Sequence, residues 1–270
     1  MTALTDTEFH VLAEYAHDYF GLNLKEKRHL IENRLNSLLL KRGLSSFSAL
    51  YQILIKDANS DLVSEVADRL STNHTYFMRE SRHFDFFREQ VLPELKARAK
   101  NRDLRIWSAG CSSGQEAYTL AMIISDFFAG QKGAWDTRIL ATDISSRSLA
   151  QAREAWYGTE DLDRLPAAWR KVYFTRPEQG KSRVLDSLKN EVIFRRFNLL
   201  EEHFPFAQKF QVIFCRNVMI YFDTETKRQL VKRFYEHTAP GGYLFIGQSE
   251  SLNWENIGYQ YVIPSVYRRD

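Results

Sequence analysis

Apolar residues in the segment 1–70 recur at helical spacing. They occur every three or four positions, as in Leu24, Ile31, Leu35 and Leu38. The segment contains no proline, and its only glycines are Gly21 and Gly43. Serines follow the second glycine, and serine is a favoured helix N-cap. The pattern predicts a small bundle of about four helices, with breaks near Gly21 and at 43–46.

From residue 103 the pattern changes to short apolar runs that alternate with helical periods. The run LRIWSAG precedes helical QEAYTLAMIISDFF, RILATDI precedes SRSLAQAREAWY, FQVIFCRNVMIYF precedes TETKRQLVKRFYEHTA, and GGYLFIGQSE follows. Strands that alternate with helices predict a parallel sheet covered on both faces. We therefore expect a doubly wound, Rossmann-like α/β domain after the all-α bundle.

The alternation lapses between residues 157 and 198. This stretch reads as a short helix followed by two or three β-runs, with turns near Pro177 and Gly180. We expect a β-subdomain inserted at about 162–190. The expected organisation is a helical domain over 1–70, a linker over 71–90 and the α/β domain over 91–270.

Composition and charge narrow the class of protein. The chain has 270 residues, 44% of them hydrophobic, so it can bury a sizeable core. A net charge of +3 is too small to indicate a nucleic-acid-binding protein. The first residues carry acids where a signal peptide needs a basic end, and no apolar run is long enough for a membrane span. We expect a soluble, cytoplasmic protein that does not insert into membranes.

The two cysteines indicate neither disulfides nor a metal site. Cys111 and Cys215 are too few for a disulfide framework, and neither lies in a Cys/His cluster at metal-ligand spacing. We expect both to be small buried residues and no metal to be bound.

The loop 108–114 is the first candidate ligand site. Doubly wound sheets bind ligands beyond the carboxyl ends of their strands, and small residues let this loop approach a ligand closely. Glu116 follows in the first helical turn, where an acid would compete with a phosphate for the N–H groups. The loop favours an adenosine without phosphate, attached to a cation. Alternatively, Glu116 only complements the helix dipole.

Asp143 ends the second predicted strand. An acidic side chain at this place accepts hydrogen bonds from ribose hydroxyls in dinucleotide-binding folds. The alternative is that Asp143 caps the helix that starts near Ser145.

Five ordered motifs resemble the CheR-type chemoreceptor methyltransferases. They are STNHTYFMRE (71–80), SAGCSSGQEAYT (108–119), ATDI (141–144), Asn198-Leu199 and FCRNVMIYFD (214–223). That family methylates glutamate side chains on chemotaxis receptors with S-adenosylmethionine, leaving S-adenosylhomocysteine. The resemblance spans about 70–250. It departs at Gln115 and Ala117, where the family usually has a second acid and a proline.

The resemblance implies a role for each matching residue. Asn73, Thr75 and Arg79 would meet the methionine end and the reaction centre from the linker. Glu116 would bind the amino acid or adenosine portion, Asp143 the ribose, Asn198 and Leu199 the adenine, while Arg216 and Asn217 close the pocket and Tyr221 faces the methyl. The alternatives are that Arg79 is a surface residue paired with Glu80 or Glu89, and that Tyr221 belongs to the core.

The implied chemistry needs few ionisable residues. A glutamate side chain, with a reference pKa of about 4.3, is already a nucleophile at neutral pH and requires no general base. The protein has to hold carboxylate oxygen, methyl carbon and sulfur in line and dry. Arg79 could orient the substrate carboxylate as a bidentate donor.

Two rival functions remain open from the sequence. One rival is a methyltransferase for nucleic acid or a small molecule. An enzyme that methylates amino groups of DNA bases would carry an Asn/Asp-Pro-Pro-aromatic motif at residues 216–219, where this chain has no proline. The chain could also be a non-catalytic adaptor that binds the nucleoside and a signalling partner.

Basic residues gather between positions 25 and 42. Lys27, Arg34 and Lys41 are seven residues apart and would form one stripe on a helix. We expect this stripe to dock the acidic methylation region of a chemoreceptor, the alternative being an ordinary solvated face.

The turn at 175–183 bears on receptor tethering. In some CheR-type enzymes the β-subdomain captures a pentapeptide at the receptor's C-terminus by strand addition, and those members share a glycine-rich turn. Here the stretch holds one glycine, Gly180, and Pro177 lacks a backbone donor. We therefore expect that a C-terminal pentapeptide tether is not required.

Overall fold

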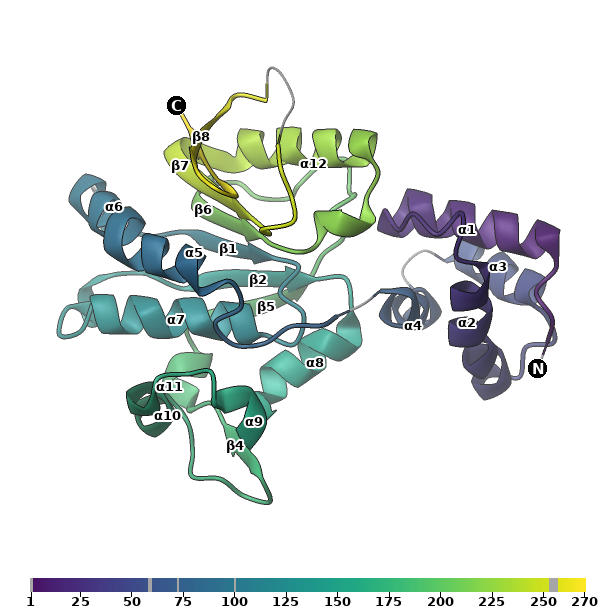
Figure 1. The fold of residues 1–270 in the computed structure, drawn as a ribbon, viewed down its shortest axis with the longest axis horizontal. Coiled ribbons are helices and arrows are strands. Elements are labelled where there is room, and N and C mark those ends of the chain that lie inside the picture. Colours follow the sequence, from purple (N-terminus) through teal and green to yellow (C-terminus); the bar gives the residue numbers. More distant parts are fainter. Residues whose placement is uncertain (1, 58–59, 72, 100, 253–256) are drawn as a thin grey trace.

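The computed structural model describes residues 2–57, 60–71, 73–99, 101–252 and 257–270. Its N-terminal part is the predicted helical bundle, which lies beside the α/β part in Figure 1. The bundle consists of α1 (Asp6–Phe20), α2 (Arg28–Arg42), α3 (Phe47–Lys56) and α4 (Asp61–Leu70). Gly21 and Gly43 end α1 and α2 in the left-handed conformation, and Ser46 caps α3. The breaks predicted at these positions are confirmed.

A seven-stranded sheet forms the centre of the described α/β part. The strand order is β5-β2-β1-β6-β7-β9-β8, and the first five strands run parallel. The strands are β1 (Ile106–Ala109), β2 (Ile139–Asp143), β5 (Val192–Arg196), β6 (Phe210–Cys215), β7 (Thr238–Ile246), β8 (Tyr259–Ile263) and β9 (Val266–Arg269). The predicted doubly wound sheet is confirmed. It carries in addition an antiparallel β8–β9 hairpin at the β7 edge, which the sequence pattern does not predict.

Helices cover both faces of the sheet because alternate residues of the central strands are buried on opposite sides. Phe214 and Phe245 belong to one core and Trp107 and Ile213 to the other. The first core receives α5 (Ser81–Phe86), the π-helical turn η1 (Phe87–Val91), α6 (Leu92–Arg98), α7 (Gln115–Phe127) and α8 (Ser146–Glu154), and the second receives α12 (Thr224–His237). No helix in the described ranges is long and apolar enough to cross a membrane.

The stretch between α8 and β5 forms a small subdomain (Figure 1). Its elements are β3 (Trp156–Gly158), α9 (Thr159–Leu162), α10 (Ala167–Tyr173), β4 (Lys181–Arg183) and α11 (Asp186–Lys189). β4 pairs with β3 on one side. On the other side, Lys181 of β4 bridges to Glu178, and Val184, directly after β4, bridges to Phe174. The sheet thus takes its first strand from residues before 162, and the segment has more helix than the β-runs expected from the sequence.

The helical bundle contacts the α/β part through the C-terminal end of α1. His17 Nε2 hydrogen-bonds Asp223 Oδ2, and Asn198 Nδ2 donates to the carbonyl of Tyr19 at 2.7 Å. The N–H of Asn23 donates to the carbonyl of Tyr221 at 3.1 Å. These contacts, which we call the interdomain seam, fix the bundle next to the carboxyl ends of the parallel strands.

Candidate active site

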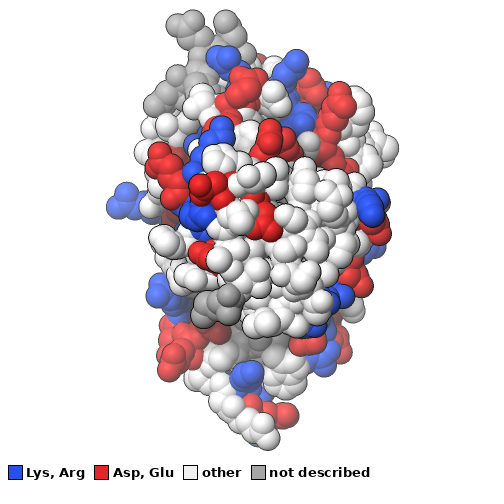
Figure 2. Space-filling view, turned by 90° about the vertical axis from the view of Figure 1, so that its right-hand side faces the viewer, with Lys and Arg blue, Asp and Glu red and all other residues white. Residues whose placement is uncertain are grey.

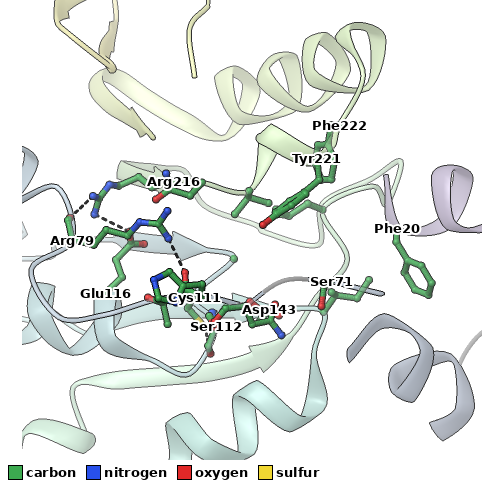
Figure 3. A pocket seen from close by; sticks show the side chains of 18 of the residues that line it. Phe20, Ser71, Arg79, Cys111, Ser112, Glu116, Asp143, Arg216, Tyr221 and Phe222 are labelled. Atoms are coloured by element: carbon green, nitrogen blue, oxygen red, sulfur yellow. Dashed lines mark hydrogen bonds and ion pairs between the residues drawn. The ribbon is translucent and has the colours of Figure 1, made fainter. Parts of the chain in front are cut away.

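A pocket opens between the helical bundle and the carboxyl ends of β1, β2 and β6 (Figure 3). Ten residues to which the resemblance assigns a role line this one pocket. They are Asn73, Thr75, Arg79, Glu116, Asp143, Asn198, Leu199, Arg216, Asn217 and Tyr221. They come from the linker and from segments that follow four different strands, so the fold brings together side chains far apart in the sequence.

The loop after β1 forms the floor of the pocket. The N–H groups of Gly110 and Cys111 both donate to the carbonyl of Thr142, at 2.8 and 2.9 Å. Gly110 has a φ of 82°, and a Cβ there would lie 2.3 Å from Cγ2 of Val218. Only glycine suits this position, because the loop passes directly against the segment that follows β6.

Asp143 points into the pocket from the end of β2 and is 8% exposed. Its Oδ2 accepts the N–H of Ser112 at 2.8 Å, and its Oδ1 accepts the N–H of Ser145 at 2.9 Å. Burial raises the pKa of Asp143, and these N–H groups partly offset that effect because they favour the carboxylate. The alternative role as helix cap is not what the structure shows, because Ser145 caps α8 by accepting the N–H of Ser148 at 2.9 Å.

Glu116 and Arg216 form an ion pair at the opposite end of the pocket. Arg216 Nη1 donates to Glu116 Oε2 at 3.2 Å, and Ser108 Oγ donates to Glu116 Oε1 at 2.7 Å. Burial raises the pKa of Glu116, against the lowering effects of Arg216 and Ser108. Glu116 does lie in the first turn of α7, yet its side chain serves this polar cluster as well as the helix dipole.

The linker is held against the pocket by its own polar groups. Asn73 Nδ2 donates to Ser148 Oγ at 3.0 Å, and Ser112 Oγ donates to the carbonyl of Asn73 at 3.1 Å. Arg79 Nη1 donates to the carbonyl of His74 at 2.7 Å. The surface pairs considered for Arg79 are not formed, because Glu80 pairs with Arg216 and Glu89 with Arg88.

Asn198 lies where the pocket meets the interdomain seam. Its Nδ2 binds the carbonyl of Tyr19, and its Oδ1 accepts the N–H of Leu200 at 3.0 Å. Phe20 and Leu22 of the bundle line the same end of the pocket, a contribution that sequence reasoning missed. The only signal for it was an apolar residue directly before the helix-ending glycine.

Tyr221 extends its hydroxyl toward the pocket in Figure 3. Its ring also packs against the core of the bundle and the core around α12. Tyr221 therefore lines the pocket and packs against the core at the same time. Cys111 lines the pocket too, but it is 1% exposed and burial raises its pKa well above the ordinary value, so its thiol stays neutral.

The expected basic stripe on α2 is not formed as one free surface. Lys27 precedes the helix, and Arg34 Nη1 donates to the carbonyls of Arg69, Leu70 and Ser71 at 3.1, 2.9 and 3.1 Å. Lys41 pairs with Glu65 at 3.2 Å. Figure 2 shows basic and acidic side chains interspersed on this side of the molecule. The Arg34 side chain points to α4 and does not join a free basic surface, because the C-terminal carbonyls of a neighbouring helix attract a cation.

Comparisons with known proteins agree along the whole chain. The family model "CheR methyltransferase, SAM binding domain" matches residues 73–267, and "CheR methyltransferase, all-alpha domain" matches residues 7–71. The chemotaxis protein methyltransferase of Borreliella burgdorferi is 40% identical, over 99% of this chain and 95% of the relative. Chemotaxis protein methyltransferase 1 of Pseudomonas aeruginosa is 38% identical, over 84% and 83% of the two chains.

The Escherichia coli chemotaxis protein methyltransferase is 34% identical, over 93% of this chain and 86% of the relative. Both family models match in the order in which the helical bundle and the α/β part occur in the structure. The chain belongs to the CheR methyltransferase family.

Proposed function

We infer that this chain transfers a methyl group from S-adenosylmethionine to glutamate side chains of chemotaxis receptors. The reaction gives glutamate methyl esters and S-adenosylhomocysteine. The observation that carries the inference is the convergence of ten motif residues on one pocket between the bundle and the sheet. The family assignment over both domains supports the same activity.

The pocket suits the cofactor's three parts. Asp143 offers both carboxylate oxygens to a ribose diol, since each oxygen can accept more than the one N–H that holds it. Asn198, Leu199 and Phe20 line the end proposed for adenine. Glu116, Arg216 and Arg79 supply charges of both signs for the amino acid portion. When bound, S-adenosylmethionine supplies an electrophilic methyl group on a sulfonium.

The remaining residues orient the substrate. Glutamate is ionised at neutral pH, so no side chain has to remove a proton. We propose that Arg79 orients the glutamate carboxylate and that Tyr221 borders the path of the methyl group. Positioning of this kind can lower a barrier by several kcal/mol.

A labelling experiment separates this function from its rivals. Purified protein is incubated with methyl-labelled S-adenosylmethionine and either receptor cytoplasmic fragments or DNA. Label on the receptor that mild alkali releases as methanol indicates an ester. Alkali-stable label, or label on DNA, would indicate methylation of nitrogen, and complete lack of transfer would indicate a non-catalytic adaptor.

We propose that the receptor's methylation region docks beside Tyr221. A groove next to the pocket is lined by apolar residues and by Asn23, Lys25, Glu26 and Lys27, and it shares Leu22, Tyr221 and Phe222 with the pocket. Its lysines favour a helix that carries carboxylates. Lys41 could extend this docking surface, whereas Arg34 is engaged in holding α4.

We also propose that receptor recognition does not require a C-terminal pentapeptide. Residues 174–178 run beside β4 and are joined to its neighbourhood by two isolated bridges, and the turn between them closes through Gln179 and Gly180, both at positive φ. A strand added on this side would meet Pro177, which has no N–H, and the other edge is the three-residue strand β3. In a calorimeter the pentapeptide should give no heat of binding, and methylation should survive removal of the receptor tail. A micromolar isotherm would refute this proposal.

A further inference from the structure

Glu80 lies outside the pocket lining, at the centre of the polar cluster behind it. Its Oε2 accepts from Arg216 Nη2 at 3.0 Å and from the N–H of Gln248 at 3.2 Å. Its Oε1 accepts from Asn217 Nδ2 at 3.0 Å. Glu80 therefore connects the linker to the residues that follow β6 and β7.

The backbone conformation of Glu80 is consistent with its contacts to Arg216, Asn217 and Gln248. Glu80 is the residue before α5, and its side chain makes no capping hydrogen bond to that helix. Its φ of 56° is a left-handed conformation that residues other than glycine rarely adopt. Such a conformation is retained where surrounding contacts enforce it. Here the contacts are those with Arg216, Asn217 and Gln248.

Arg216 is shared between two carboxylates. Its side chain is 2% exposed, with Nη1 bound to Glu116 and Nη2 bound to Glu80 and to the carbonyl of Arg79. Glu116 consequently does not receive the bidentate pair that an arginine can give to one carboxylate. His83 Nδ1 lies 3.4 Å from Glu80, but burial lowers the pKa of His83 to about 4, so it adds no positive charge at neutral pH. The cluster thus has two carboxylates for one guanidinium.

We propose that Glu80 is a positioning residue that shares Arg216 with Glu116, so that the negative charge of Glu116 is only partly compensated and can hold the ammonium group of the cofactor's amino acid portion. The inference rests on the proposed cofactor. If Glu80 lost its charge, Glu116 would be the only carboxylate paired with Arg216, and the charge of the guanidinium would compensate that of Glu116 more fully. The pocket would then hold the ammonium group less tightly while the adenosine contacts stayed unchanged.

Calorimetry with two ligands tests this inference. S-adenosylhomocysteine carries the ammonium group, and 5′-methylthioadenosine has the same nucleoside without the amino acid portion. In Glu80→Gln, the Kd of S-adenosylhomocysteine should rise about tenfold or more, the loss of one charge-assisted contact. The Kd of methylthioadenosine should change less than about twofold, because this ligand has no ammonium group.

Glu94→Gln is the matched control. Glu94 is also partly buried and accepts hydrogen bonds from two arginines and a tyrosine, but it does not line the pocket. Both affinities should be unchanged in this variant. If Glu80→Gln does not fold, Glu80→Asp serves instead, because it retracts the carboxylate and should weaken S-adenosylhomocysteine selectively, to a smaller extent.

The possible outcomes separate a failure of the proposed Glu80 role from a failure of the proposed cofactor. Equal weakening of both ligands by Glu80→Gln would show a general structural role, and unchanged affinities would show that Glu80 is dispensable. Either result overturns the positioning role while leaving the cofactor assignment intact. Failure of the unaltered protein to bind S-adenosylhomocysteine would instead refute the proposed function.

Discussion

Asp143 and Ser145 divide two tasks that a single residue could have performed. Ser145 caps α8, which frees the Asp143 carboxylate to face the pocket while two backbone N–H groups hold it in place. A carboxylate fixed in this way does not have to lose side-chain freedom when it meets a ribose. The two residues therefore offer a direct comparison of binding and structural roles.

Asp143→Ala should weaken S-adenosylhomocysteine binding about ten- to hundredfold, because it removes a charged acceptor worth about 1.5–3 kcal/mol. Ser145→Ala should lower stability by about 1 kcal/mol through the lost cap and leave affinity nearly unchanged. Calorimetry and thermal unfolding measure both. Equal weakening by the two substitutions would mean that Asp143 acts only by supporting the loop.

Arg79→Ala should lower kcat by about a hundredfold or more and weaken cofactor binding far less, because its main proposed task is alignment of the reacting groups. Arg88→Ala is the control, since Arg88 pairs with Asp85 and Glu89 on the surface. Titration with S-adenosylhomocysteine and steady-state kinetics give the two quantities. A parallel loss of affinity and rate would contradict the assignment.

At the scale of elements, α2 and α4 form a charged pair of helices rather than a helix with one free basic face. Arg34 holds the C-terminal carbonyls of α4, and Glu65 of α4 holds Lys41 and Arg42. The chain enters the pocket directly after α4, where Ser71 is a lining residue. Arg34 thus supports the segment that enters the pocket, and the proposed docking surface would use the outer lysines instead.

Lys27→Glu together with Lys41→Glu should raise the apparent KM for receptor fragments and flatten its dependence on salt, because favourable long-range attraction is lost. Cofactor affinity should not change. Lys171→Glu, on the exposed side of α10, is the control. Receptor kinetics that are unaltered in the double variant would show that these lysines are only a solvated surface.

Much of the fold follows from sequence periodicity, since the bundle and the doubly wound sheet each have their own spacing of apolar residues. The loop 108–114, Glu116 and Asp143 could be predicted because they follow the carboxyl ends of predicted strands. The other pocket residues were assigned only through the resemblance to CheR-type enzymes.

The contacts of Arg34 and Glu80 could not be predicted from the sequence, because tertiary partners decide in which direction a charged side chain points. The β8–β9 hairpin was missed because several of its residues, such as Gln260 and Arg268, are polar. In addition β9, the strand that pairs with β7, has only four residues.

At the scale of the whole molecule, the pocket exists only where the bundle meets the sheet. Phe20 and Leu22 complete its wall from the bundle, and the seam contacts of His17, Asn23 and Asn198 hold that wall in place. We therefore expect cofactor binding in this pocket to stabilise the arrangement of the two domains.

The seam should be sensitive to pH. Hydrogen bonds to Asp223 and then to Asp18 raise the pKa of His17 above 6.5, so its stabilising effect is complete below about pH 6.5 and is lost as pH rises through the raised value. Between about pH 6 and 9 the Tm of the unaltered protein should fall more than that of His17→Gln. His29→Gln, an exposed histidine of α2, is the control. Parallel profiles for His17→Gln and the unaltered protein would contradict a charged seam.

We propose that glutamate side chains are methylated in this pocket. Tandem mass spectrometry of receptor cytoplasmic fragments, after incubation with S-adenosylmethionine and the protein, tests this reaction. We expect the added mass of one methylene on particular glutamate residues, removable by mild alkali and greatly reduced with the Arg79→Ala variant. Modification confined to lysine, arginine or cysteine, or none in fragments that bind the protein, would contradict it.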